Sequence, residues 1–233
     1  MNGQDIVAQS SVSAVLGRFF TKVYTWMALG LALTGFVAAF VASEPSMQKA
    51  ILGSSGNLIL IIIAQLAMVF ILSARIQKLS PAAATTLFII YAALNGLTFS
   101  TIFLIYSGQS IAQVFFISAG TFGGMSVYGY FTKKDLTGVG RIAIMGLWGV
   151  ILASVVNLFF KSSAFDYLTS LIGVVIFVAL TAYDTQKLKV MATGFQEESE
   201  GYAKMAILGA LALYLDFINL FLMLLRLFGD RRR

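Results

Sequence analysis

The chain has 233 residues, of which 59% are hydrophobic and only 11% are charged. A soluble domain usually has about 25% charged and roughly 45–50% apolar residues, so the composition excludes an ordinary soluble fold and predicts a single lipid-embedded domain. The sequence has no cysteine and no histidine, which excludes disulfides and removes the commonest general base and transition-metal ligand. The net charge of +6 does not indicate a nucleic-acid partner, because the basic residues lie in short connections between apolar runs.

Seven apolar segments are long enough to cross a membrane, which takes roughly 20 residues in a helix. They are Val23–Ala42, Asn57–Ala74, Ala82–Tyr106, Ile111–Phe131, Ile142–Phe160, Tyr167–Tyr183 and Met205–Phe228. The runs are continuous and lack the period-two alternation of a membrane β-barrel. We therefore predict an all-α, polytopic integral membrane protein. Residues 1–22 form a polar N-terminal segment, 23–229 the transmembrane domain and 230–233 a short basic tail.

The distribution of basic residues predicts the orientation, because cytoplasmic loops carry an excess of Lys and Arg. Ten basic residues lie near helix ends on the side of the N-terminus: Arg18, Lys22, Arg75, Lys78, Lys133, Lys134, Arg141, Lys187, Lys189 and Lys204. The opposite loops have only Lys49 and Lys161. We expect a cytoplasmic N-terminus and, after seven spans, a C-terminus on the other side. The basic tail leaves open a six-span or re-entrant variant in which the tail is also cytoplasmic.

Small residues within the spans indicate where helices pack, since helices in lipid associate through small side chains and interhelical hydrogen bonds. Gly120 and Gly124 form a GxxxG pair in the fourth segment. Gly149, Ala153 and Asn157 share one face of the fifth segment at four-residue spacing. We expect close packing at these positions.

Four amide side chains within the spans are candidates for lining a pore: Gln65, Asn95, Asn157 and Asn219. A water-filled path needs such groups. They could equally form hydrogen bonds with a neighbouring helix or within their own helix. The sequence leaves both alternatives open.

Two carboxylates are associated with the predicted spans: the sixth span runs directly into Asp184, and the seventh contains Asp216. A carboxylate at the centre of a bilayer costs roughly 2.5–3.5 kcal/mol, so it normally faces water or a partner. Asp216 shares a small and polar helix face with Gly209, Ala212 and Asn219. Because these residues recur at three- and four-residue steps, we expect that face to point into the bundle.

The two aspartates are expected to meet, because the sixth and seventh segments are consecutive and antiparallel. A seventh helix that starts at Met205 would make direct contact harder. Two neighbouring carboxylates in a low dielectric cannot both ionise cheaply, so such a pair shares a proton and responds to pH. Its oxygens are also the ligand type that calcium prefers. Alternatively, Asp184 caps a helix end beside Lys187, and Asp216 is a permanently protonated structural acid.

Arg75 is the nearest basic candidate to pair with the two aspartates. It ends the second segment, on the side where the sixth segment also ends. A salt bridge from Arg75 to the pair would make it a gating residue. The competing interpretation is an ordinary anchor at the cytoplasmic surface together with Lys78.

Four stretches of the sequence resemble the Bax inhibitor-1 family, also called the transmembrane Bax inhibitor motif family. The most specific are "LTAYDTQKLK" at 180–189 and "LYLDFINLFLMLLRLFG" at 213–229. Two more, "VYTWMALGLALTG" at 23–35 and "ALNGLTFSTIF" at 93–103, are similar to its bacterial, YccA-like branch. The resemblance implies a seven-helix bundle with the last helix central, in a bacterial inner membrane with the C-terminus in the periplasm.

The resemblance also implies a function, because members of this family are described as pH-sensitive calcium-leak channels. The family's paired aspartates match Asp184 and Asp216, and an arginine that contacts them in some members aligns approximately with Arg75. Gln65 stands where some bacterial members have a glutamate, which implies weaker attraction of divalent cations. The expected ligands are therefore calcium ions and protons, with no cofactor and no enzymatic activity.

Two other classes of function stay open. Residues 1–18 are polar and could bind a larger membrane complex, such as a quality-control protease, which would make the chain a regulatory membrane protein. Paired aspartates also occur in aspartyl proteases. The "AYD" at 182–184 matches the YD motif of the intramembrane type, but "LYLDF" at 213–217 lacks the GxGD motif.

Overall fold

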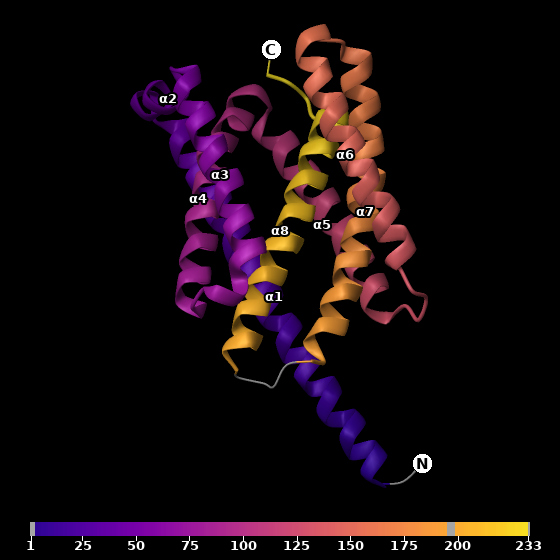
Figure 1. Ribbon diagram of the computed structural model, residues 1–233. Helices are drawn as coiled ribbons and strands as arrows, with labels where there is room; N and C mark the ends of the chain where they lie inside the picture. The colour runs from indigo at the N-terminus through magenta and orange to yellow at the C-terminus, as the bar shows by residue number, and fades with distance from the viewer. Residues whose placement is uncertain (1–2, 195–198, 233) are drawn as a thin grey trace. The chain divides into compact units, whose positions relative to one another are not determined.

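The computed structural model describes residues 3–194 and 199–232, and the regular elements in this part of the chain are helices (Figure 1). In chain order they are α1 (Gly3–Ser43), α2 (Pro45–Leu52), α3 (Ser55–Arg75), the 3-10 turn η1 (Ile76–Lys78), α4 (Pro81–Ile105), α5 (Gly108–Phe131), α6 (Thr137–Phe160), α7 (Ser163–Ala192) and α8 (Glu200–Phe228). Within the described residues, seven of these helices are long and apolar enough to cross a membrane, namely α1 and α3 to α8. The predicted all-α, seven-span fold is confirmed.

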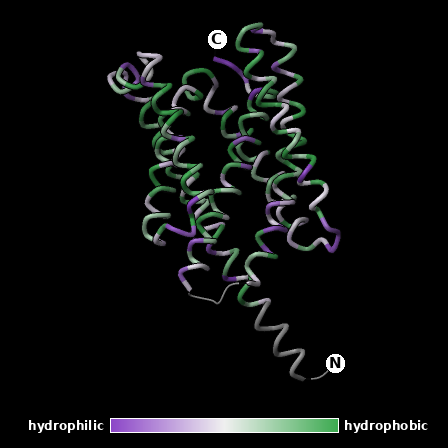
Figure 2. Tube along the Cα trace, viewed as in Figure 1, coloured by the Kyte–Doolittle hydropathy of each residue, from purple (hydrophilic) through white to green (hydrophobic). Residues whose placement is uncertain are grey.

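Figure 2 shows hydrophobic residues along the long helices and polar residues gathered at several of their connections. Most of the spanning helices are longer than the predicted segments, and α1 and α7 extend furthest beyond them. α1 begins at Gly3, so the polar N-terminal segment is continuous with the first span, residues 1–2 lying outside the described part. α7 continues from Tyr183 to Ala192, because the residues after Tyr183 include no glycine or proline to end it. Asp184 is therefore an interior residue of α7 and not a helix cap.

The chain forms two compact units, one of Met1–Leu104 with Lys189–Leu211 and the other of Ile105–Leu188 with Ala212–Arg233. In the first unit, α1 and α4 approach each other closely. The Thr34 hydroxyl on α1 donates a hydrogen bond to the Ala92 carbonyl on α4, at 2.8 Å. A Cβ added to Gly96 of α4 would lie 2.6 Å from Cβ of Val37, so only glycine allows this crossing.

α8 contributes residues to both units and is the most buried of the seven spans. In its most apolar 18-residue stretch 72% of the residues are buried, against 6–39% in the other six helices. A helix surrounded by protein is buried on most sides, whereas a peripheral helix exposes one face to lipid. This degree of burial agrees with the predicted central position of the last helix.

The glycines that the sequence indicated as packing positions are not at close contacts. A Cβ added to Gly120, Gly124 or Gly149 would meet no atom of the described residues within 4 Å. The prediction of close packing at these glycines is wrong. Small-xxx-small spacing recurs in any apolar chain and does not by itself identify the packed face.

The C-terminal tail pairs with the connection between α4 and α5 in the second unit. The Ser107 N–H donates to the carbonyl of Asp230 at 3.1 Å, and the Arg232 N–H donates to that of Ile105 at 2.8 Å. The Asp230 N–H donates to the Ser110 hydroxyl at 2.9 Å. In a seven-span protein α4 and α8 run in the same direction and end on the same side, so this pairing supports seven spans over six. Arg233 lies outside the described residues.

Candidate functional site

Asp216 lies on the buried face of α8, as its sequence pattern predicted. Its side chain is only 4% exposed, and its neighbours Leu213 and Leu220 are fully buried. Within the described residues, the carboxyl oxygen Oδ2 of Asp216 has no hydrogen-bond partner. A buried polar atom without a partner costs roughly 1–3 kcal/mol, and more when it is charged. The site therefore holds a buried carboxyl group with one oxygen that no described group hydrogen-bonds.

Asp184 on α7 is half-buried and acts electrostatically on Asp216, so the structure brings the two predicted carboxylates together within the second unit. Lys187, three residues further along α7, acts electrostatically on Asp184. The Lys187 ammonium lies 5.9 Å from the centroid of the Tyr183 ring, a cation–π contact. Asp184 is thus under the electrostatic influence of a buried carboxyl and of a basic side chain.

Two glycines set the position of α7 just before Asp184, and sequence reasoning missed both. A Cβ on Gly129 of α5 would collide with the backbone carbonyl of Ala182, and a Cβ on Gly140 of α6 would collide with the Tyr183 ring. Both contacts fall within two residues of Asp184. Because Gly129 meets backbone, α7 has no freedom to approach α5 more closely at this level. No GxxxG spacing marks either glycine.

α8 is placed against α5 and α7 by side chains close to Asp216. The Phe217 ring packs edge-to-face on Phe115 and Phe122 of α5, with ring centroids 5.3 and 5.6 Å apart. A Cβ on Gly173 of α7 would lie 2.9 Å from the Met223 side chain of α8. α7 and α8 therefore meet at Gly173 and Met223.

Gln186 connects the α7 site to the loop between α5 and α6. Its side-chain oxygen accepts a hydrogen bond from the Leu136 N–H, and its side-chain nitrogen donates to the Lys134 carbonyl, both at 2.8 Å. The preceding residue is Thr185, whose hydroxyl donates to Ser126 of α5 at 3.4 Å and to the Thr181 carbonyl at 2.7 Å. These bonds tie the Asp184 region to fixed backbone.

The four candidate pore-lining amides form hydrogen bonds in the structure. Gln65 donates to the Thr98 hydroxyl of α4 at 3.3 Å, whereas Asn95 and Asn219 donate to carbonyls one turn earlier in their own helices. Asn157 donates to Asp166 at 2.6 Å and to the Ser162 carbonyl at 3.1 Å, and it accepts from the Ser162 N–H. The Asn157 amide thus organises the α6–α7 turn.

Arg75 ends α3 with an exposed side chain, at the position the sequence predicted. It belongs to the first unit, whereas Asp184 and Asp216 belong to the second. Its contact with the aspartate pair stays a prediction. Among the described residues, no three Asp, Glu, Cys or His side chains gather closely enough to hold a metal ion, so a cation at the aspartates would meet only these two carboxylates.

The fold and the site define a class: a polytopic α-helical membrane protein whose most buried helix carries a carboxyl group next to a second one. The family model described as inhibitor of apoptosis-promoting Bax1 matches residues 16–233. The chain belongs to this family, the Bax inhibitor-1 family.

Three relatives extend over nearly the whole chain. The inner membrane protein YbhL of Escherichia coli (strain K12) is 52% identical over 220 residues, 94% of each chain. An uncharacterized protein of Borreliella burgdorferi is 46% identical over 229 residues, 98% of each chain. The uncharacterized membrane protein SpyM3_0260 of Streptococcus pyogenes is 39% identical over 242 residues, 98% of this chain and 99% of the relative.

The similarity to these relatives concerns two predictions, the cellular location of the protein and its branch of the family. Together with the seven spans, the likeness to YbhL identifies a multi-pass protein of the inner membrane. The relatives do not place the chain specifically in the YccA-like branch. Which end faces the cytoplasm stays a prediction from the basic residues.

Proposed function

We propose that the chain is a pH-sensitive calcium-leak channel in which Asp184 and Asp216 form the proton sensor. The observation that carries the proposal is the buried carboxyl of Asp216, with an unpartnered oxygen, beside a second carboxyl on the neighbouring helix. Two interacting carboxyls in a low dielectric cannot both be charged at low cost, so the pair binds and releases protons as a unit. Membership of the Bax inhibitor-1 family supports the proposal.

The proposed gating movement depends on how firmly α7 and α8 are fixed by the helices packed against them. Loss of the shared proton leaves two negative charges between α7 and α8, and like charges repel more strongly where water is excluded. α7 is fixed on α5 and α6 at Gly129 and Gly140, next to Asp184. The repulsion is therefore expected to move α8 rather than α7, and Arg75 would complete the gate by pairing with the carboxylates.

Calcium would compete with protons for this pair, because the cation prefers deprotonated carboxylate oxygens. Two carboxylates alone are fewer than the six to eight oxygen ligands that calcium takes when tightly bound. Such a sparse site suits passage of the ion more than storage. Gln65, Asn95, Asn157 and Asn219 stay candidates for the polar path, and Gln65 and Asn219 are the half-buried members of this group.

The test is calcium flux into proteoliposomes across a pH series. Asp216→Asn and Asp184→Asn remove the charge while keeping the side-chain shape, so each should abolish most of the pH response. Asp135→Asn is the matched control, because Asp135 is an exposed carboxylate in the α5–α6 loop of the same unit. An unchanged pH profile in Asp216→Asn would overturn the mechanism, and no flux above empty vesicles from folded protein would overturn the channel.

A second candidate function is a regulatory protein that binds a larger membrane complex, such as a quality-control protease. The favouring observation is α1, whose 41 residues make roughly 60 Å of helix, longer than the roughly 40–45 Å of a bilayer with its headgroups. Its first turns therefore reach beyond the membrane. Deleting residues 1–12 should abolish co-purification of the partner complex and leave calcium flux unchanged, whereas retained partners would reject this function.

A further inference from the structure

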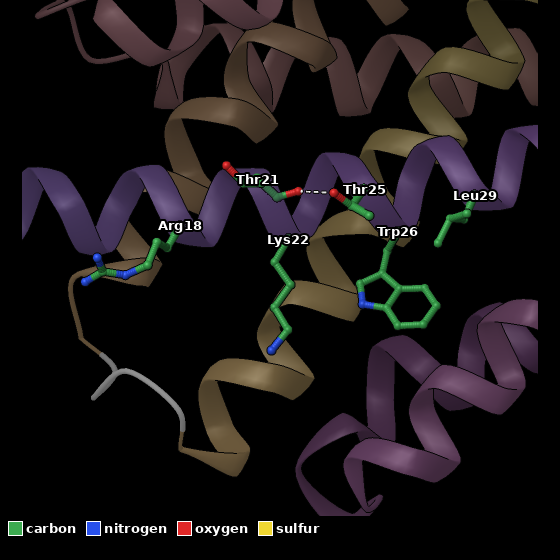
Figure 3. Close-up of a pocket in the computed structure, with 6 residues that line it drawn as sticks. All are labelled: Arg18, Thr21, Lys22, Thr25, Trp26 and Leu29. Carbon is green, nitrogen blue, oxygen red and sulfur yellow. Dashed lines mark hydrogen bonds between the residues drawn. The ribbon is translucent and has the colours of Figure 1, made fainter.

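A groove runs along one side of α1 in the first unit. It has a volume of about 410 Å³ and is lined by Arg18, Thr21, Lys22, Thr25, Trp26 and Leu29 (Figure 3). Figure 3 shows Lys22 and Trp26 extending from the same side of the helix, with the indole nitrogen on the side of Lys22. None of these residues takes part in the aspartate site.

The lining changes from basic to apolar along the helix. Arg18 and Lys22 lie at one end, Trp26 follows one turn later, and Leu29 lies at the other end with 55% of its side chain exposed. The distance from Arg18 to Leu29 along the helix is roughly 16 Å. A tryptophan between basic and aliphatic side chains is typical of the headgroup level of a membrane. The order of the side chains therefore matches a phospholipid, with its phosphate at one end and its acyl chain at the other.

The charged end of the groove is held in place by α8. The Lys22 ammonium lies 5.7 Å from the centroid of the Tyr202 ring, and the Tyr202 ring packs edge-to-face on Phe19 with centroids 5.4 Å apart. This cation–π contact orients Lys22 and leaves its three N–H donors available to an anion.

The two threonines in the groove do not supply donors. The Thr21 hydroxyl donates to the Gly17 carbonyl at 2.9 Å, and the Thr25 hydroxyl donates to the Thr21 carbonyl at 2.7 Å. An anion would thus meet the Lys22 ammonium and the indole N–H, beside the positive charge of Arg18. Such a set recognises a phosphate group by charge, as basic clusters at the cytoplasmic ends of spans recognise anionic headgroups.

We propose that this groove binds an anionic phospholipid, whose phosphate contacts Arg18 and Lys22 and whose acyl chain lies along Trp26 and Leu29. A free phosphate ion would use the two cations but not the exposed apolar end, which is why a lipid fits better. The site is separate from the aspartate pair and does not depend on the calcium pathway.

The two tryptophans of the chain, Trp26 and Trp148, make the proposal measurable. Trp148→Phe leaves Trp26 as the only indole, and its fluorescence is quenched when a brominated lipid contacts it. The protein is reconstituted in phosphatidylcholine that contains equal mole fractions of brominated phosphatidylglycerol or brominated phosphatidylcholine. We expect the anionic lipid to quench Trp26 at a roughly twenty-five-fold lower mole fraction, since each of the two basic side chains contributes about fivefold.

Variants of the basic residues test which side chains give the preference for the anionic lipid. Arg18→Gln and Lys22→Gln, each in the Trp148→Phe background, should lower the preference about fivefold, whereas the charge-conserving Arg18→Lys and Lys22→Arg should retain it. Lys49→Gln removes a basic residue from α2 and should leave it unchanged. Trp26→Phe leaves Trp148, which is 63% exposed on α6 and should be quenched equally by both lipids.

Three results would overturn the proposal. The first is equal quenching of Trp26 by both brominated lipids. The second is a preference that is undiminished in both Arg18→Gln and Lys22→Gln. The third is complete loss of the preference when millimolar inorganic phosphate is added at constant ionic strength, since this would assign the two cations to a free ion instead of a lipid.

Discussion

Helices α8 and α3 are both continuous apolar spans, yet they occupy opposite extremes of burial. In the most apolar stretch of α8 72% of the residues are buried, and in that of α3 only 6%. α8 carries Asp216, whereas the polar side chain in the middle of α3 is Gln65, which bonds to Thr98 on the neighbouring α4. A helix enclosed by protein can hold a carboxyl group, because neighbouring side chains and water can solvate it; a helix that faces lipid cannot.

The comparison separates two kinds of information in a membrane sequence. Apolar length identifies that a helix spans the bilayer and applies equally to α3 and α8. Small and polar residues at three- and four-residue steps identify which helix is enclosed, and these are present in α8 around Gly209, Ala212 and Asp216. Four experiments test how far this distinction extends, from the largest expected effect to the smallest.

The largest effect should come from truncating one leucine in each helix. Leu213 of α8 is fully buried and Leu60 of α3 is 67% exposed. Leu213→Ala leaves a cavity and should lower the free energy of unfolding by about 2–5 kcal/mol, whereas Leu60→Ala should change it by less than about 0.5 kcal/mol. Unfolding monitored by circular dichroism in mixed micelles measures both. Equal losses would mean that α3 is as enclosed as α8.

The second experiment compares two faces of α5. Gly129→Ala places a methyl group against the Ala182 carbonyl and should destabilise the fold by about 1–3 kcal/mol. Gly124→Ala, on the same helix, meets no described atom within 4 Å. It should be neutral or stabilising by up to about 1 kcal/mol, since alanine favours the helix. The same unfolding measurement applies, and a stable Gly129→Ala variant would show that α7 can move away from α5.

The third experiment tests the α6–α7 turn, which lies at the opposite end of α7 from Gln186. Asn157→Ala removes the bonds to Asp166 and Ser162 and should cost about 1–2 kcal/mol. Asn219→Ala is the control, because its amide bonds only within its own helix among the described contacts and should cost less. If Asn157→Ala instead left stability unchanged and altered calcium flux, Asn157 would be assigned to the polar path.

The smallest effect is expected at Gln65 of α3. Hydrogen bonds between helices in membranes contribute about 0.6 kcal/mol on average. A double-mutant cycle of Gln65→Leu and Thr98→Val should therefore give a coupling free energy near that value. A coupling of several kcal/mol would contradict a peripheral α3 and would indicate that its polar face is enclosed.

Much of the fold was predictable because it follows from apolar length. Each of the seven spans overlaps its predicted segment, and the α8 face with Asp216 is buried as its periodicity indicated. The helix ends were less predictable. The composition of residues 3–22 does not distinguish a polar helix from a polar extended segment. After Tyr183, α7 continues beyond the apolar run from which its end was predicted.

The ionisable residues of the site were predictable from the sequence, whereas the residues that position its helices were not. Asp184 and Asp216 stand out because charges inside spans are rare. Gly129 and Gly140 do not stand out, since their role depends on which backbone passes beside them. The GxxxG pair at Gly120 and Gly124 was misleading for the same reason. The role of Asn157 depends on Asp166, nine positions away, and on the turn between them.

The paired tail at 229–232 has a mechanical consequence for α8. Its backbone bonds to Ile105, Ser107 and Ser110 oppose sliding of the helix along its axis, because a piston movement would break all of them together. Tilting about this end would keep them. Asp216 lies twelve residues from Phe228, about 18 Å from such a pivot, so a tilt of about 5° displaces its carboxyl by roughly 1.5 Å. The tail thus acts as a pivot for α8, and a tilt about it displaces the Asp216 carboxyl in proportion to its distance from the tail.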